Sequence, residues 1–307
     1  MNSTDSPFAQ LRQDPRVLLG PGPSNIHPRV SQAMTSPILG YLDPEFLRIM
    51  DDTMALLRHL FQTENEMAIS LAGTGMAAME AAVCNVTEPG DEIIVGIHGF
   101  FGQRMAEIVE RHGGTAVRVE VDFGEVVATE QIAAALDAHP NAKMVGVVHG
   151  ETSSGVGQPL AEIGRLVRER EKLFLVDTVC SLGGSDIRVD EFLIDICYSG
   201  GQKCIGGPAG ISCITLNERA LEVVASRSTP VDTWYLDLIL ISKYWFADRA
   251  YHPTAPGPPL SPPLRWKVAS GGRSAGLEGR LLRAISLARS RGPDWPASRN
   301  MAAASVW

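Results

Sequence analysis

The sequence is poor in positive charge and contains no long apolar run. Its 307 residues include 27 Lys and Arg against 35 Asp and Glu, which gives a formal net charge of −8. Nucleic-acid binding requires clustered basic side chains that neutralise phosphates, so this balance argues against a nucleic-acid partner. The stretch that comes closest to a membrane span, residues 235–246, is short and is interrupted by Asp237 and Lys243. We therefore expect no nucleic-acid partner and no membrane.

Targeting signals and paired cysteines are also missing. The first ten residues, MNSTDSPFAQ, have neither the basic start nor the apolar core of a signal peptide. No two cysteines form a C-x-x-C pair, which favours reduced, mostly buried thiols over disulfides or a metal site. We expect a cytoplasmic protein without a metal centre. The five cysteines are Cys84, Cys180, Cys197, Cys204 and Cys213.

The charge is divided unevenly along the chain. Residues 257–307 hold eight basic and two acidic side chains, a net charge of +6, whereas residues 1–256 hold 19 basic and 33 acidic ones, a net charge of −14. Five prolines between 256 and 263 open the basic segment, and they indicate a linker. Residues 277–290 have the apolar spacing of a helix. The composition separates residues 257–307 from everything that precedes them.

Short apolar runs alternate with longer amphipathic stretches from residue 46 to residue 216. The runs are rich in Val and Ile without polar alternation, which is typical of a sheet covered on both faces. The pattern predicts an α/β fold with a mostly parallel sheet, and one of the last two strands is a candidate antiparallel member. We expect helices at 46–61, 76–86, 102–112, 130–138 and 160–170, and strands at 67–72, 92–97, 116–121, 143–149, 173–177, 194–198 and 211–216.

Glycines and polar residues follow five of the expected strands. Ligands of open α/β sheets bind beyond the carboxyl ends of the strands, where such segments meet. We therefore expect a site at this edge of the sheet. The segments are 73–75, 98–101, 149–152, 177–178 and 199–203.

The segment Gly73-Thr74-Gly75 lies between an expected strand and an expected helix. Glycines let backbone N–H groups approach an anion, and a helix N-terminus adds the positive end of its dipole, which suits a phosphate. Gly73, Gly75 and Ala78 also fit the dinucleotide pattern G-x-G-x-x-A, although the next strand does not end in the acidic residue that would bind a ribose. A tight turn without a ligand is the third interpretation.

Asp177 ends one expected strand, and Lys203 follows another. Asp177 fits a cap, a metal ligand or the counter-ion of a cofactor nitrogen, and capping is the simplest of the three. Lys203 precedes a glycine-rich segment and is either a surface charge or an amine confined for Schiff-base chemistry. An anion cradle, a strand-end Asp and a glycine-flanked Lys are together the parts that pyridoxal phosphate needs.

Several motifs carry a family resemblance. In order along the chain they are LLGPGPSN (18–25), the GTG turn (73–75), GFFGQR (99–104), HGETSSGV (149–156), LVDTVCSLGG (175–184), YSGGQK (198–203) and YHPTAP (251–256). Together they resemble the class V pyridoxal-phosphate aminotransferases of the alanine–glyoxylate / serine–pyruvate type. The resemblance is nearly gap-free from residue 17 to residue 256. Gln202, before the lysine, resembles the residue found in the aminotransferase branch. The related cysteine desulfurases usually have His at this position, and this sequence has no match to their catalytic Cys.

The resemblance implies a role for each matched residue. Lys203 would bind pyridoxal 5'-phosphate as a Schiff base and then move the proton of the substrate's Cα. Asp177 would pair with the pyridinium nitrogen, and Phe101 would stack on the ring, where many relatives have Trp. Thr152 would hydrogen-bond the ring hydroxyl or bind near the substrate carboxylate.

The remaining matches concern the phosphate, the substrate and the partner subunit. Thr74, Gly75, Met76 and Gln202 would bind the phosphate, Met76 through its backbone N–H because some relatives have His there. Tyr251 and Thr254 resemble phosphate ligands that cross to the neighbouring site of a homodimer. Pro21 and Gly22 match a loop at the edge of the substrate pocket. The implied substrates are a small amino acid, alanine or serine, and a 2-oxo acid, glyoxylate or pyruvate.

The resemblance also implies domains. Residues 1–16 would be an N-terminal arm, and residues 17–256 the large domain of a type I pyridoxal-phosphate transferase. Residues 257–307 do not resemble the small domain that carries the family's substrate-binding Arg, and their composition suggests out-of-frame translation as a hypothesis. Arg265, Arg273 and Arg280 are the available substitutes. The chain is then either a ping-pong aminotransferase or a protein that binds the cofactor but is catalytically impaired.

Overall fold

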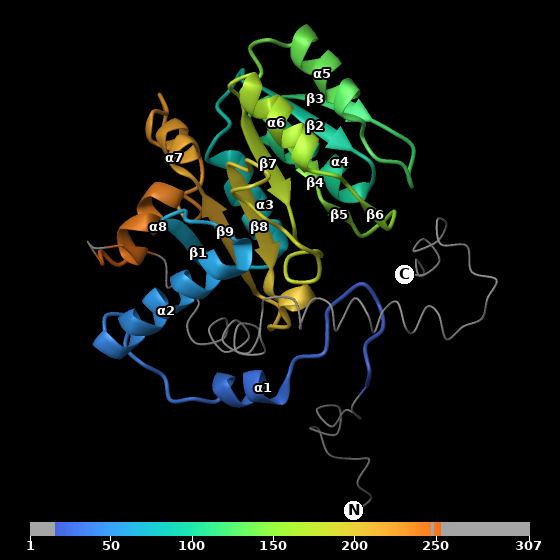
Figure 1. Cartoon of the computed structure of the whole chain (residues 1–307). Coiled ribbons are helices and arrows are strands. Elements are labelled where there is room, and N and C mark those ends of the chain that lie inside the picture. Colours follow the sequence, from blue (N-terminus) through green and yellow to red (C-terminus); the bar gives the residue numbers. More distant parts are fainter. Residues whose placement is uncertain (1–15, 247–248, 253–307) are drawn as a thin grey trace, which may run out of the picture.

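The computed structural model describes residues 16–246 and 249–252 (Figure 1). The N-terminal arm at 1–16, apart from Arg16, lies outside these residues. So do Thr254, the segment 257–307 and the helix expected at 277–290. The described part holds a seven-stranded sheet with helices packed on both of its faces.

The strand order of the main sheet is β1-β9-β8-β7-β4-β2-β3. Only β9 runs antiparallel to its neighbours, β1 and β8, so the prediction of a mostly parallel sheet with one late antiparallel strand is confirmed. A small hairpin, β5 with β6, follows β4. The bounds are β1 Met67–Ala72, β2 Glu92–Ile97, β3 Thr115–Glu120, β4 Met144–Val148, β5 Gly150–Glu151, β6 Val156–Gly157, β7 Leu173–Asp177, β8 Ile196–Gly200 and β9 Ile211–Leu216.

The five predicted helices are present with ends shifted by at most two residues. The longest, α2, begins at Pro44, and Asp43 caps it by accepting from the Glu45 N–H at 2.8 Å. The sequence reading missed three further helices, α1, α7 and α8, of which α8 is the apolar stretch first examined as a membrane span. The bounds are α1 Pro28–Met34, α2 Pro44–Phe61, α3 Gly75–Cys84, α4 Phe100–Arg111, α5 Thr129–Ala138, α6 Ala161–Glu169, α7 Glu218–Ala225 and α8 Leu238–Trp245.

Two hydrophobic cores lie on the two faces of the sheet. Helices α3, α4, α7 and α8 cover one face, and α5 and α6 cover the other, while α2 contributes to both (Figure 1). In β2, Ile93 and Val95 belong to the core under α3 and α4, and Ile94 belongs to the core under α5 and α6. Because both faces are covered, these strands need no polar positions, which explains their uninterrupted apolar runs.

Asp195, just before β8, joins four elements through a buried carboxylate. It accepts from Arg168 and Arg219 at 2.9 Å each, from the Asn217 side chain at 2.7 Å and from the Phe174 N–H at 2.8 Å. Only 1% of its surface is exposed. A buried charge is stable only when it is paired and fully hydrogen-bonded, and Asp195 meets both conditions.

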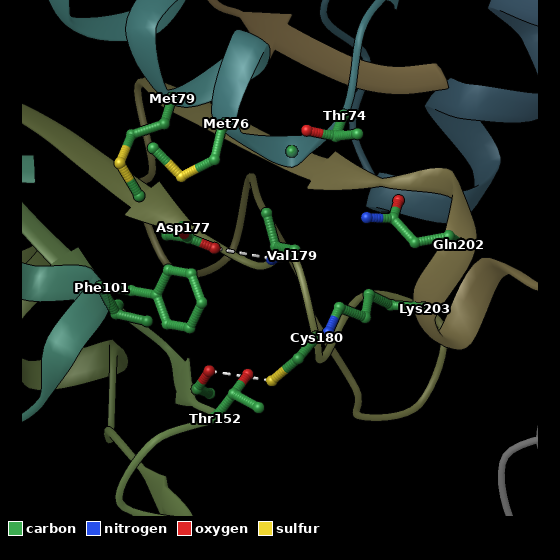
Figure 2. Close-up of a pocket in the computed structure, with 13 residues that line it drawn as sticks. Thr74, Met76, Met79, Phe101, Thr152, Asp177, Val179, Cys180, Gln202 and Lys203 are labelled. Carbon is green, nitrogen blue, oxygen red and sulfur yellow. Dashed lines mark hydrogen bonds between the residues drawn. The ribbon is translucent and has the colours of Figure 1, made fainter. Parts of the chain in front are cut away.

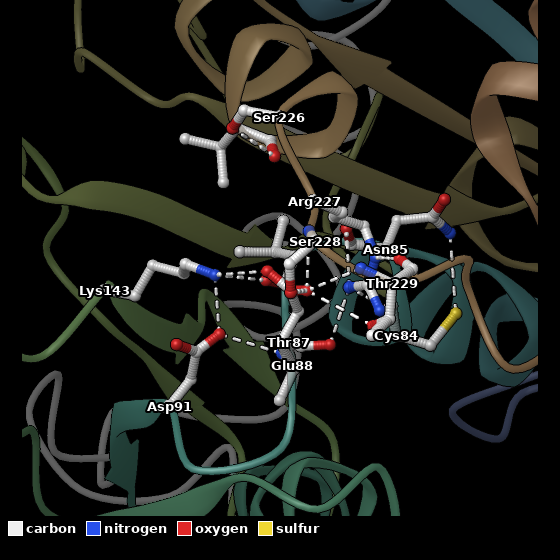
Figure 3. A network of polar contacts seen from close by, with 12 residues as sticks. Cys84, Asn85, Thr87, Glu88, Asp91, Lys143, Ser226, Arg227, Ser228 and Thr229 are labelled. Carbon is white, nitrogen blue, oxygen red and sulfur yellow. Dashed lines mark hydrogen bonds and ion pairs between the residues drawn. The ribbon is translucent and has the colours of Figure 1, made fainter.

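A second polar network fastens the chain after α7 to the loop between α3 and β2 (Figure 3). The Arg227 guanidinium donates to the carbonyls of Cys84 and Asn85, which are left without helical partners at the end of α3, and to the Thr87 carbonyl in the loop beyond it. The Glu88 carboxylate accepts from the N–H and hydroxyl groups of Ser228 and Thr229. These bonds, above all those from Ser228, lower the pKa of Glu88 to about 2.

The Asp195→Asn variant should lose about 3 kcal/mol of unfolding free energy, because two guanidinium groups lose their buried counter-charge. Urea denaturation at pH 7 measures this loss. Asp137→Asn is the matched control, since Asp137 pairs with Arg170 at the surface, where its side chain is 67% exposed. The control should lose less than about 1 kcal/mol. Equal losses in the two variants would contradict the role of Asp195.

The Glu88→Gln variant should be destabilised by about 2 kcal/mol at pH 7, and this difference from wild type should shrink as the pH falls. The folded pKa of about 2 lies below the usual 4.5, so the charged form contributes stability above pH 4.5 that is lost on the way to pH 2. Urea denaturation at pH 7, 5 and 3 gives the difference at each pH. A difference that does not change with pH would contradict this account.

Candidate active site

A cavity of about 170 Å³ lies at the carboxyl ends of β4, β7 and β8, against the first turn of α3 (Figure 2). This is the edge of the sheet that the sequence pattern indicated. Eight residues predicted from sequence line it, namely Thr74, Gly75, Met76, Phe101, Thr152, Asp177, Gln202 and Lys203. The other lining residues are Met79, Val148, Gly150, Val179 and Cys180.

The first turn of α3 forms one wall of the cavity. Gly73 has a φ of +125° and turns the chain out of β1, and Thr74 follows as N-cap without a side-chain cap bond. The first N–H groups of a helix have no partner within it and carry the positive end of its dipole. A Cβ on Gly75 would lie 2.6 Å from a Val179 methyl group, so only glycine fits here. This wall suits an anion.

Gln202 brings a buried polar group next to the same wall. Its Oε1 atom has no hydrogen-bond partner within the part of the chain that the structure describes. A Cβ placed on Gly200 would be 2.9 Å from this atom and 3.5 Å from the backbone nitrogen of Gly75. A 180° turn of the amide would present its NH2 donors at the same place. A ligand bound at this wall would therefore satisfy a group that the protein alone leaves unpaired.

The Asp177 carboxylate is buried, with 3% of the residue exposed. One oxygen accepts from the Val179 N–H at 2.7 Å, and the other accepts from the Tyr198 hydroxyl at 2.9 Å. Burial outweighs both bonds and raises the pKa of Asp177 to about 7. The simplest interpretation of Asp177 from sequence, a helix cap, is wrong, because no helix begins there and the bond to Val179 closes a turn instead.

Tyr198 was missed by the sequence analysis, which used it only as a strand end. The register of β7 against β8 places it directly beside Asp177. No local signal marks this pairing, because it depends on which strands become neighbours. Its hydroxyl holds the carboxylate from the side away from solvent, since Tyr198 is fully buried.

Phe101 enters the cavity from the first turn of α4 (Figure 2). The Glu151 carboxylate, 1% exposed, accepts from the N–H groups of Phe101 at 2.9 Å and Gly102 at 3.3 Å. Its other oxygen accepts from the Ser153 N–H at 3.1 Å and hydroxyl at 2.6 Å. A Cβ on Gly99 would lie 2.2 Å from the Glu151 side chain, so glycine is required where α4 begins. Glu151, also missed from sequence, fixes the position of Phe101.

Thr152 and Cys180 lie together on the wall facing α3. The Cys180 thiol donates to the Gly150 carbonyl at 2.8 Å. Burial raises the pKa of Cys180 to about 11, although a hydrogen bond with Thr152 acts in the opposite direction. The thiol is therefore neutral near pH 7 and acts as a small wall residue rather than as a nucleophile.

Lys203 lies in a five-residue π-type turn, Gly201–Ile205, that follows β8. Its Nζ donates to the Pro21 carbonyl at 2.9 Å, and Gly22 lies directly against its side chain. The loop expected at the edge of the substrate pocket therefore contacts the lysine itself. Pro21 and Gly22 do not line the cavity.

Tyr251 lies away from this cavity. Its ring stacks on Tyr41 with centroids 5.6 Å apart, and it meets Tyr244 edge-on at the same distance. The residue is 54% exposed. Thr254, its predicted companion, lies outside the described residues. Tyr251 therefore does not line the cavity of its own chain.

His98 and His149 directly follow β2 and β4 and do not line the cavity. His98 is fully buried and its Nε2 contacts the Val148 carbonyl at 2.8 Å. Burial lowers the pKa of His149 to about 4, and the nearby His98 adds to this effect. Across residues 16–246 and 249–252, no group of three or more His, Cys, Asp or Glu side chains is arranged to hold a metal ion. In the same part of the chain, no helix combines the length and apolarity needed to cross a membrane.

Known proteins with similar sequences include two aminotransferases that act with glyoxylate. The alanine–glyoxylate aminotransferase of Drosophila melanogaster is 40% identical over 243 residues, which are 78% of this chain and 61% of that protein. The (S)-ureidoglycine–glyoxylate transaminase of Bacillus subtilis is 38% identical over 257 residues, or 78% of this chain and 62% of that protein. The chain thus spans about three fifths of the length of these curated relatives.

Solved structures agree with the fold. An alanine–glyoxylate aminotransferase from Nostoc sp. matches with a TM-score of 0.85 and 41% identity, covering 94% of this chain and 78% of that one. The ureidoglycine–glyoxylate aminotransferase from Bacillus subtilis matches with a TM-score of 0.84 and 38% identity, covering 89% and 70%. These neighbours have the type I fold of pyridoxal-phosphate-dependent aminotransferases, which confirms the predicted fold class.

The model of the family "Aminotransferase class-V" matches residues 18–235, a span that includes every residue lining the cavity. The chain therefore belongs to the class V aminotransferase family.

Proposed function

We propose that this chain binds pyridoxal 5'-phosphate and transfers an amino group from a small amino acid, alanine or serine, to glyoxylate or pyruvate. One observation carries the proposal: an amine, a buried carboxylate and a helix N-terminus line the same cavity, contributed by Lys203, Asp177 and α3. The names of the relatives, which act on alanine or ureidoglycine with glyoxylate, support the substrate class.

The residues present fit this cofactor. The unpaired amide of Gln202 beside the first turn of α3 offers the phosphate a polar partner next to the helix dipole. Thr74, Gly75 and the backbone of Met76 complete that wall. At the other end of the cavity, the Asp177 carboxylate has two donors where a buried carboxylate accommodates about four. A cationic ring nitrogen would supply what it lacks.

Pyridoxal phosphate, when bound, supplies an electron sink for charge that develops at the substrate's Cα. Lys203 Nζ would hold the cofactor covalently and would take up the proton that leaves Cα. Asp177 would keep the ring nitrogen protonated, Phe101 would pack against the ring, and Thr152 would donate to the ring hydroxyl or the substrate. Tyr198 would keep the Asp177 carboxylate in place.

Assembly, domains and compartment belong to the same proposal. We infer a cytoplasmic homodimer in which Tyr251 and Thr254 complete the phosphate site of the partner subunit. Tyr251 supports this arrangement, because it is exposed and does not line the cavity of its own chain. Residues 17–256 would form the large domain.

A second candidate is a protein that binds the cofactor without efficient turnover. It is favoured by residues 257–307, where nothing resembles the domain that carries the family's substrate-binding Arg. A bidentate Arg orients the substrate carboxylate. Without it, the rate of turnover should fall much more than the affinity for the cofactor.

Assays of wild type separate these candidates, and the Lys203→Ala variant tests the role of the lysine. Wild type mixed with pyridoxal phosphate should give an absorbance band that borohydride reduces, and should form pyruvate from L-alanine and glyoxylate. Lys203→Ala should lose the reducible band and about 10³-fold in turnover, because the covalent anchor and the base are removed together. Lys172→Ala is the control, since Lys172 lies at the surface between α6 and β7. A band without turnover in wild type selects the second candidate, and the absence of the band contradicts both.

The Asp177→Asn variant should stabilise the cofactor-free protein while weakening its affinity for pyridoxal phosphate. The folded pKa of about 7 lies above the usual 3.8, so Asp177 contributes stability that is fully present below pH 3.8 and is lost as the pH rises toward 7. We expect a gain of about 2 kcal/mol in unfolding free energy at pH 8, a smaller gain at pH 5 and none below about pH 4, with cofactor affinity reduced at least about tenfold. Urea denaturation and spectroscopic titration measure the two effects. A loss of stability at pH 8 would contradict the assignment.

A further inference from the structure

Residues 20–25 lie on the turn that carries Lys203. Ser24 makes the principal contact: its N–H donates to the Gln202 carbonyl at 2.8 Å, and its hydroxyl donates to the Lys203 carbonyl at 2.8 Å. The hydroxyl is also 3.2 Å from the Gln202 carbonyl. These groups are almost 180 residues apart in sequence, so the contact depends wholly on the fold.

The turn that Ser24 contacts has an irregular backbone. Within Gly201–Ile205, Lys203 has φ −98° and ψ −131°, values outside the helical region. A residue in such a conformation keeps it only when surrounding contacts require it. The Lys203 carbonyl accepts from the Gly206 N–H at 3.0 Å as well as from Ser24. Ser24 thus bonds from outside the turn to the backbone carbonyls of both Gln202 and Lys203, and these bonds hold the backbone at Lys203 in place.

The same loop also reaches the far end of the lysine. Nζ donates to the Pro21 carbonyl at 2.9 Å. Gly22 has a φ of +135°, and a Cβ there would lie 2.6 Å from Cδ and 2.7 Å from Nζ of Lys203. The loop therefore passes along the whole side chain, and only glycine permits that approach.

The loop has its own internal support. The Asn25 side chain accepts from the Leu18 N–H at 2.7 Å and donates to the Arg16 carbonyl at 2.9 Å. These bonds close the segment 16–25 on itself before it meets the turn. The Pro21 carbonyl thus belongs to a shaped loop whose attachment to the lysine turn runs through Ser24.

We propose that Ser24 is a positioning residue for Lys203: it attaches loop 20–25 to the lysine turn and so holds the Pro21 carbonyl against Nζ. An amine that donates one N–H to Pro21 has its remaining valences directed toward the cavity, where the aldehyde of the cofactor and the Cα proton of the substrate would lie. This inference rests on the proposed function, since only there does the direction of Nζ matter to a reaction.

The test measures the reactivity of Lys203 without any cofactor. The full chain, freed of bound pyridoxal phosphate with hydroxylamine, is methylated with limiting formaldehyde and borane, and each lysine is quantified by mass spectrometry. Lys172 is the internal reference, because its Nζ also donates to a proline carbonyl, that of Pro140 at 2.6 Å. Ser24→Ala should raise the ratio of Lys203 to Lys172 labelling about fivefold, which corresponds to one lost hydrogen bond.

Two further variants separate positioning from general damage. Ser24→Thr keeps the hydroxyl and should keep the wild-type ratio. Ser31→Ala removes an exposed serine hydroxyl from α1 and should also leave the ratio unchanged. If Ser24→Ala does not fold, Ser24→Cys carries the same expectation, because a thiol donates only weakly.

An unchanged or lowered ratio in the Ser24 variant would overturn the inference. So would an equal rise in Ser24→Thr, since the hydroxyl would then be irrelevant. Failure of the proposed function has a different signature, namely the absence of a borohydride-reducible band in wild type. The two results come from separate measurements on the same preparation, so one can fail while the other holds.

Discussion

The candidate site depends on the burial of one carboxylate that is only half satisfied. Asp195 and Glu151 are as deeply buried as Asp177, but each accepts four hydrogen bonds. Asp177 accepts two, which do not offset the effect of its burial, and its pKa stands near 7. The protein thus saturates the hydrogen-bonding capacity of the two carboxylates that hold elements together. It leaves the carboxylate that lines the cavity with unused capacity. Such a deficit costs stability and becomes useful when a cationic ligand binds.

The sheet explains how these groups come together. Parallel strands bring their carboxyl ends to one edge, so Asp177 from β7 and Lys203 after β8 approach the same cavity. The antiparallel strand β9 lies between β8 and β1, and its preceding Gly210 carbonyl accepts from the Gly73 N–H at 2.8 Å. The start of α3 is thereby fastened beside the lysine turn. The anion-binding wall and the amine then face one space.

Much of this arrangement could be predicted from sequence, and the omissions share a cause. Apolar runs, glycines and caps are local features, so most helix and strand positions were predicted correctly, and eight of the predicted site residues line one cavity. Tyr198, Glu151 and Ser24 were not recognised as parts of the site. Each acts on a residue that is distant in sequence or on a neighbouring strand, as when Ser24 reaches Lys203 across 179 positions. The sequence near each of these residues gives no indication of the residue that it contacts.

The sequence by itself determined the α/β alternation, the charged residues at strand ends and the family, because hydrophobic periodicity, turn chemistry and ordered motifs are properties of short segments. Only the tertiary structure decided how those residues behave. The pKa of Asp177 follows from burial between packed strands. The hydrogen bond that Lys203 Nζ makes depends on a loop 182 positions earlier in the chain. Desolvation and long-range hydrogen bonds exist only once distant segments are packed together, which is why no local pattern contains them.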